Sequence, residues 1–153
     1  MRARARNFER LEMNYFDHEK LDVYKAAIKF IVLVDEIIKH LPRGRSYLAE
    51  QLQRAGTSVP LNIAEGSGEY SGNEKVRFYR MAKRSATECA GILEICRELK
   101  LIEEALYLNG RELLIRIVAM LTKMAQTINL KSGTGTHAGT GTKMFEGNHG
   151  PYS

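Results

Sequence analysis

A chain of 153 residues has room for one domain, and with 44% hydrophobic and 27% charged residues it has the make-up of a soluble globular protein rather than a disordered chain or a fibre. Two cysteines cannot build a disulfide framework, and no apolar run is long enough for a signal peptide or a membrane span, so we expect a cytoplasmic protein. The net charge of +5 is compatible with binding a polyanion but does not require it.

Composition divides the chain into three regions. Residues 1–15 form an Arg-rich N-terminal extension without a regular apolar stripe. Residues 131–153 form a Gly/Thr-rich tail, which we expect to be disordered because glycine loses much backbone entropy on ordering and few side chains there can bury surface. Residues 16–130 between them carry the periodic apolar pattern of a folded domain.

The first predicted helix covers residues 17–41 and ends where Pro42 restricts the residue before it. Three- and four-residue spacing predicts a core-facing stripe on this helix, made of Tyr24, Ile28, Ile31, Val34, Ile38 and Leu41. The second predicted helix begins near Ser46 and stops before the break Gly66-Ser67-Gly68. Its core-facing residues are Leu48, Leu52, Ala55, Val59 and Ile63.

The third predicted helix opens on a capping box of Ser71 and Glu74 and continues to about Lys100. Its inward residues are Phe78, Ala82, Ala86, Cys89, Leu93 and Cys96, so both cysteines are expected to be buried small hydrophobes. The fourth covers residues 102–129, with Gly110 as its weak point. Its inward residues are Leu106, Leu113, Ile117, Leu121, Met124 and Ile128.

No window alternates in the manner of a strand, so we predict an all-α, up-down-up-down antiparallel four-helix bundle. Two helices carry additional apolar residues outside the predicted core stripes, and we expect this surplus to contact another subunit. These residues are Val23, Phe30, Leu33 and Ile37 in the first helix, and Leu114 and Val118 in the fourth.

The segment 58–66, with the sequence SVPLNIAEG, is unusual for a helix because Pro60 lies in its interior. We expect a kink there, relieved by Gly56 and by the Thr57 or Ser58 hydroxyl. If the second and third helices are antiparallel neighbours, a polar network can cross between them. Its expected members are Asn62, Glu65, Arg84, Ser85 and Glu88.

These motifs resemble those of the four-helix-bundle family encoded within bacterial large-subunit rRNA intervening sequences. The family pattern is Ser-(Ile/Val)-Pro-x-Asn-Ile-Ala-Glu-Gly, followed one helix later by Phe and Ala-x-x-Ser-x-x-Glu. This chain has residues 58–66, then Phe78 and residues 82–88 (AKRSATE), and residues 21–26 (LDVYKA) match the opening helix. Arg84 departs from the pattern, where Gly is common. The matching residues Ser58, Pro60, Asn62, Glu65, Gly66, Ser85 and Glu88 are interpreted as a structural polar network.

The resemblance implies a homo-oligomer, often a ring-shaped pentamer, without established catalytic residues. A related branch, the accessory proteins of diversity-generating retroelements, associates with a reverse transcriptase and its RNA. The resemblance therefore favours RNA as a partner, and it gives no reason to expect a cofactor, a metal or a small-molecule substrate.

Two sharper readings of the polar residues remain as alternatives. Paired carboxylates at Glu65 and Glu88 would suit a hydrolase, although no histidine is expected near them. A metal-binding Glu-x-x-His spacing occurs at Glu146 and His149, in the Gly-rich tail, where a stable helix is not expected.

A basic stripe on the third helix carries the functional prediction. Its members are Lys75, Arg77, Arg80, Lys83 and Arg84. We predict a non-enzymatic, self-associating bundle whose stripe contacts RNA phosphates. The alternative is a protein-interaction scaffold that self-assembles without binding nucleic acid.

Overall fold

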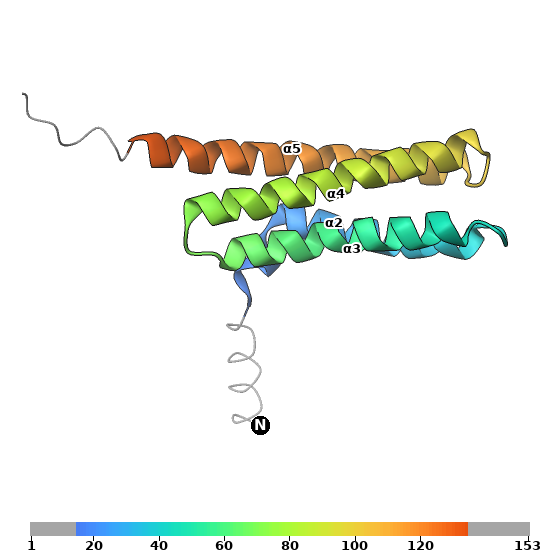
Figure 1. Ribbon diagram of the computed structural model, residues 1–153, viewed down its shortest axis with the longest axis horizontal. Helices are drawn as coiled ribbons and strands as arrows, with labels where there is room; N and C mark the ends of the chain where they lie inside the picture. Colours follow the sequence, from blue (N-terminus) through green and yellow to red (C-terminus); the bar gives the residue numbers. More distant parts are fainter. Residues whose placement is uncertain (1–14, 135–153) are drawn as a thin grey trace, which may run out of the picture.

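Four long helices form one bundle in the computed structural model, which describes residues 15–134. Each helix packs on its neighbour in sequence and α2 also packs on α5, so the four helices form a closed bundle (Figure 1). This part of the chain contains no strand, which confirms the all-α four-helix prediction. The elements are the 3-10 helix η1 (Asp17–Lys20) and the α-helices α2 (Asp22–His40), α3 (Ser46–Gly68), α4 (Gly72–Glu98) and α5 (Glu104–Thr134).

Two helices run farther than predicted. Helix α3 continues through the expected break and ends at Gly68, and α5 passes Asn129 and ends at Thr134. The Arg-rich segment 1–14 and the tail 135–153 lie outside the described residues, as does the Glu146-to-His149 spacing, so the predictions made for them stay predictions.

The start of α4 corrects the predicted capping box. Ser71 is the N-cap residue, but its side chain makes no capping hydrogen bond. The carboxylate of Glu74 lies instead 3.2 Å from Nε of Arg77, an ion pair one turn along the helix. The Ser-x-x-Glu signature of a capping box is therefore present without its hydrogen bonds, and Glu74 pairs with the guanidinium of Arg77 instead.

The core-facing stripe of α2 differs from the predicted one, of which only Val34 is buried. Ile28 is 41% exposed, and Tyr24, Ile31 and Ile38 are only half-buried. Several of the residues that fill the core had been expected to contact another subunit. Because they are buried inside the bundle, they are not a surplus apolar surface, and that prediction was wrong for these residues. Buried on α2 are Val23, Ala26, Ala27, Phe30, Val34 and Ile37, and Leu114 of α5 joins them.

The inward faces of α3 and α4 agree better with prediction. All five predicted residues of α3 are buried, and on α4 only Phe78 is half-buried rather than buried. On α5, Ile117 and Leu121 are buried as predicted, while Tyr107 also enters the core.

Gly110 is a packing residue of α5 rather than merely its weak point. A Cβ added there would lie 2.6 Å from Cδ1 of Leu93 and 3.3 Å from Cδ2 of Leu33. The missing side chain therefore lets α4 and α2 approach α5 closely, which offsets the lower helix propensity of glycine.

Helix α5 bears on the expectation that the chain has no membrane span. Over Glu104–Gly133 it is long and apolar enough to cross a membrane, with no more than two charged residues in its most apolar 18-residue stretch, of which 17% is buried. A single such helix is weak evidence, because core helices of soluble proteins meet the same criterion. Leu114, Ile117 and Leu121 of α5 are core residues of this bundle.

Candidate functional site

The antiparallel pair α3 and α4 brings the two halves of the family-like pattern together. Close contact between the helices requires glycine at position 66, because an added Cβ would lie 2.8 Å from the ring of Tyr79 and 2.9 Å from Cβ of Phe78. Gly66 is thus buried inside a continuous helix and does not terminate it. This approach sets the register that places the residues around Asn62 opposite those around Ser85.

A small polar network links α3 to α4. Ser85 Oγ donates a hydrogen bond to Ser58 Oγ at 2.9 Å, and Asn62 Nδ2 donates to Ser58 Oγ at 2.9 Å and to Ser58 O at 2.8 Å. Asn62 is 7% exposed, so these bonds replace the water that its amide loses on burial. Asn62 and Ser85 are therefore linked across the interface through the Ser58 hydroxyl.

The network forms the wall of a polar cleft of about 420 Å3, which we call the α3/α4 cleft. It is lined by Ser58, Asn62, Met81, Arg84, Ser85 and Glu88. Arg84 and Glu88 are exposed, and neither joins an ion pair in the described part of the chain.

Glu65 does not belong to this cleft, so its predicted place in the network was wrong. It is exposed and lines a neighbouring hollow on the outer face of α3, together with Arg54 and Leu61. Glu65 and Glu88 therefore line two neighbouring hollows, which adjoin at Ser58 and Asn62, and the two carboxylates do not share one cleft.

Pro60 is buried within α3, which continues through it without interruption. The Thr57 hydroxyl donates to Gln53 O at 2.7 Å, and the Ser58 hydroxyl binds Asn62 and Ser85. Pro60 has no N–H, so the Gly56 carbonyl lacks its usual donor. Neither hydroxyl bonds that carbonyl, so the prediction that Thr57 or Ser58 would replace the missing donor was wrong.

The predicted basic stripe lies on α4 beside the cleft. Arg77, Arg80 and Arg84 are exposed, and Lys83 is half-buried. Arg77 pairs with Glu74, and its guanidinium carbon lies 5.2 Å from the centre of the Phe78 ring. We call the five residues Lys75, Arg77, Arg80, Lys83 and Arg84 the basic ridge.

Lys75 has a structural partner that the sequence did not reveal. Its Nζ donates to Ser67 O at 2.8 Å and to Gly66 O at 3.4 Å. These carbonyls end α3, where a cation is favoured by the negative end of the helix dipole. Lys75 therefore caps α3 across the turn. The signal available in the sequence was a lysine in the first turn of α4, soon after the end of α3 at Gly68.

Both cysteines are buried on α4, as predicted. Burial raises the pKa of the Cys89 thiol to about 12, with a smaller contribution from the Glu88 charge, and burial also raises the pKa of Cys96. Such thiols are poor nucleophiles and poor metal ligands. In the described part of the chain, no group of three or more His, Cys, Asp or Glu side chains could hold a metal ion.

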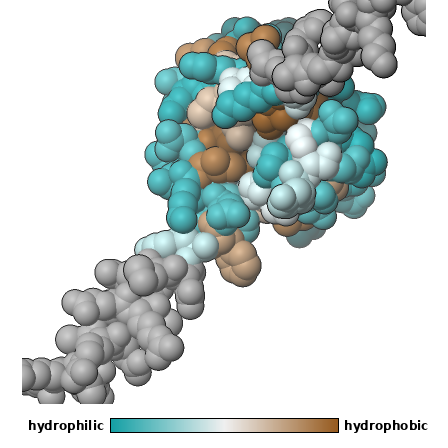
Figure 2. Space-filling view, turned by 90° about the vertical axis from the view of Figure 1, so that its left-hand side faces the viewer, coloured by the Kyte–Doolittle hydropathy of each residue, from teal (hydrophilic) through white to brown (hydrophobic). Residues whose placement is uncertain are grey.

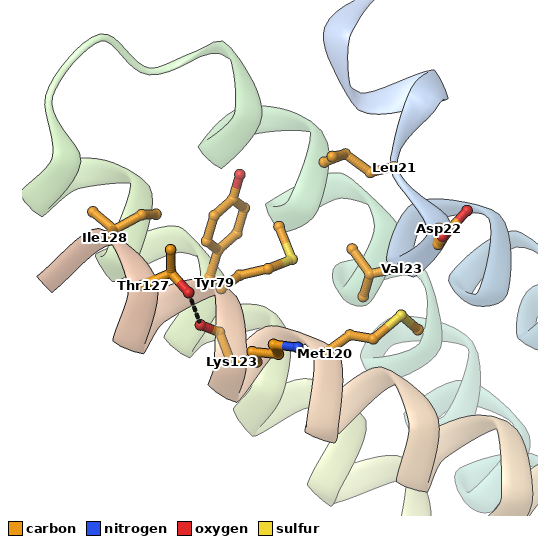
Figure 3. Close-up of a pocket in the computed structure, with 9 residues that line it drawn as sticks. Leu21, Asp22, Val23, Tyr79, Met120, Lys123, Thr127 and Ile128 are labelled. Atoms are coloured by element: carbon orange, nitrogen blue, oxygen red, sulfur yellow. Dashed lines mark hydrogen bonds between the residues drawn. The ribbon is translucent and has the colours of Figure 1, made fainter. Parts of the chain in front are cut away.

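A third hollow, which the sequence did not predict, is apolar. It lies where α2 begins, has a volume of about 400 Å3, and is lined by Leu21, Asp22, Val23, Tyr79, Met120, Lys123, Met124, Thr127 and Ile128. Figure 3 shows these side chains converging from α2, α4 and α5. The end view in Figure 2 shows apolar surface ringed by hydrophilic residues.

Comparison with known proteins agrees with the fold and with the motifs. Residues 19–123 match the family model described as "23S rRNA-intervening sequence protein". A search of curated proteins gave no match.

Proposed function

Since the chain belongs to the 23S rRNA-intervening sequence protein family, we propose that it is a non-enzymatic protein that associates with RNA in the cytoplasm, through the basic ridge of α4. The observation that carries the proposal is the exposure of Arg77, Arg80 and Arg84 along one face of α4. Guanidinium groups at i, i+3 and i+7 share that face, so they can contact successive phosphates.

The three arginines differ in how readily they can bind phosphate. Arg80 and Arg84 have no ion-pair partner in the described residues, so they contact phosphate without giving up a bond. Arg77 exchanges an exposed ion pair, a contact worth at most about 1 kcal/mol. Lys75 is committed to the end of α3 and contributes least.

The site chemistry favours binding over catalysis. The cleft holds no histidine, its single carboxylate is Glu88, and the cysteine thiols are buried with raised pKa values. The hydrolase alternative needs two carboxylates in one site, and nucleophilic catalysis needs an activated nucleophile. We therefore assign the cleft no reaction, cofactor or metal.

Self-association, in the ring-shaped pentamer that the family resemblance implies, is the second part of the proposal. A groove of about 360 Å3 between α2 and α5 contains Val32, which is 67% exposed, with Leu33 and Leu113. Lys29, Glu36, Glu112 and Arg116 also line it, so a neighbouring copy can match each charge with its opposite. A ring repeats the basic ridge on every subunit, which multiplies the phosphate contacts.

Charge reversal tests the RNA proposal. The variant R77E/R80E/R84E is compared with K25E/R43E/R111E, which makes the same change in net charge on exposed residues outside both the ridge and the α2/α5 groove. We expect the ridge variant to lose binding to a structured RNA in a filter-retention assay while the control keeps most of it, with both variants helical by circular dichroism.

Equal loss in the two variants would mean that only net charge matters. Full binding by the ridge variant would favour the alternative of a scaffold that assembles without nucleic acid. Either result overturns the assignment of the ridge.

A further inference from the structure

The α3/α4 cleft offers hydrogen-bonding groups that the fold leaves unused. Both hydrogen bonds of the Asn62 side chain are donated by Nδ2. Its Oδ1 therefore accepts none, although the residue is 93% buried. No buried side-chain nitrogen or oxygen among the described residues lacks a partner, so Oδ1 reaches the solvent where Asn62 lines two adjoining hollows, the cleft with Arg84 and Glu88 and the outer hollow with Glu65. It is therefore an acceptor held in place by the network and open to a ligand.

Arg84 and Glu88 add two side chains of opposite charge on the same face of α4. They are four residues apart on α4, which places their Cβ atoms roughly 6 Å apart on one face. The guanidinium supplies donors only and the carboxylate acceptors only, yet the two are not paired with each other. A ligand that presents acceptors beside donors can bind both side chains without breaking an existing ion pair.

We propose that the cleft binds an unpaired guanine base of the RNA. Guanine presents the acceptors O6 and N7 to an arginine and, on its Watson–Crick edge, the adjacent donors N1–H and N2–H2 to a carboxylate. Adenine and cytosine offer one amino group on that edge, and uracil offers one N–H between two carbonyls. Only guanine offers two adjacent acceptors to Arg84 and two adjacent donors to Glu88, and Asn62 Oδ1 provides a further acceptor.

The cleft has room for this ligand and the right position for it. Its volume of about 420 Å3 lies within the roughly 300–1,000 Å3 range of ligand pockets. Arg84 belongs both to the cleft and to the basic ridge, so a strand whose phosphates follow Arg77 and Arg80 passes the mouth of the cleft. The inference rests on the proposed RNA association, since the ridge supplies the affinity and the cleft supplies the base preference.

The test uses the full chain and two labelled single-stranded RNAs, a decamer of uridines and the same decamer with one central guanosine. Fluorescence anisotropy at low salt measures the dissociation constant of each. We expect the guanosine to tighten binding at least about fivefold. In E88Q, which replaces a carboxylate by an amide whose N–H groups oppose those of guanine, we expect the two RNAs to bind equally.

E94Q is the matched control, because it makes the same charge change at an exposed residue of α4 outside the cleft. It should keep the guanosine preference. Equal binding of both RNAs by the unaltered protein, survival of the preference in E88Q, or its loss in E94Q would each overturn the base-binding inference while leaving RNA association intact. Failure of the unaltered protein to bind either RNA would overturn both proposals.

Discussion

Gly66 and Gly91 lie inside neighbouring helices but have opposite surroundings. The position of a Cβ on Gly66 is filled by Tyr79 and by Phe78 Cβ, whereas no atom lies within 4 Å of the same position on Gly91. The same substitution should therefore have opposite effects at the two sites.

We predict that G66A lowers the free energy of unfolding by about 1–3 kcal/mol, because the Phe78 Cβ is attached to backbone and cannot move aside. G91A should raise the same free energy by up to about 1 kcal/mol through helix propensity alone. Urea denaturation followed by circular dichroism measures both. Stabilisation of the protein by G66A would show that α3 and α4 are not in close contact there.

Cys89 shows what burial does to a titrating group. In the folded chain its pKa is about 12, and in the unfolded chain it returns to the ordinary value near 9. We predict no alkylation of the native protein by iodoacetamide at pH 8 and full alkylation in urea. Above about pH 9 the unfolded thiol loses its proton while the folded one retains it, so this residue should lower stability as the pH rises from 9 to 12. Rapid native-state labelling of Cys89 would contradict its burial.

At the scale of elements, the turn from α4 to α5 contains a strained residue. Lys100 has a φ of 54°, a conformation that disfavours side chains with a Cβ. Lys100 N binds Arg97 O and Leu101 N binds Cys96 O, the two bonds of a Schellman C-cap with lysine in the position usually held by glycine.

We therefore predict that K100G stabilises the protein by about 0.5–1 kcal/mol, because relief of the left-handed strain exceeds the entropy that glycine adds to the unfolded chain. Thermal unfolding measures the shift, and Lys100→Ala, which keeps a Cβ, serves as the control. A larger gain from alanine than from glycine would show that the lysine charge, and not its backbone conformation, is responsible.

The sequence predicted the number, order and approximate limits of the helices, because apolar spacing, Pro42 and the glycines are local signals. It failed on the face of α2 because that helix carries apolar residues on two stripes, and spacing alone does not decide which one packs. Partners distant in sequence decide it, such as Gly110 of α5, where an added Cβ would lie 3.3 Å from Cδ2 of Leu33 and 3.8 Å from Cε2 of Phe30, both on the second stripe.

The candidate site was predictable to the same extent. Asn62 and Ser85 lie close enough to bond the same Ser58 hydroxyl, because turn length and helix periodicity fix the approximate register of the two helices. Glu65 was misplaced because it lies on the outer side of Asn62, beside Arg54 and Leu61, and spacing alone does not tell that side from the side that faces α4. The cap formed by Lys75 depends on a contact between the start of α4 and the end of α3, and the apolar spacing within one helix does not predict such a contact.

At the scale of the whole molecule, the surface divides into a basic side on α4 and a mixed apolar and charged groove between α2 and α5. Leu108 and Ile115 of α5 are also more than half exposed, so apolar surface extends beyond the groove. A contact between copies would bury this surface and leave the basic ridge outside.

We predict that V32E, which puts a charge at the groove, shifts the protein to a smaller species in sedimentation velocity. I95E, which changes a 49% exposed residue of α4 in the same way, should leave the assembly unaltered. Assembly of V32E at the same size as the unaltered protein would move the subunit contact away from the groove.

The central claim is that arginine–phosphate contacts on α4 hold the RNA. Counterion release makes the logarithm of the binding constant fall linearly with the logarithm of the salt concentration, by roughly 0.7 per contact on a single strand. A salt titration of the protein with single-stranded RNA should give such a line, and R77Q/R80Q/R84Q should flatten its slope by about two. Binding that ignores ionic strength, or that is absent even at low salt, would contradict the account.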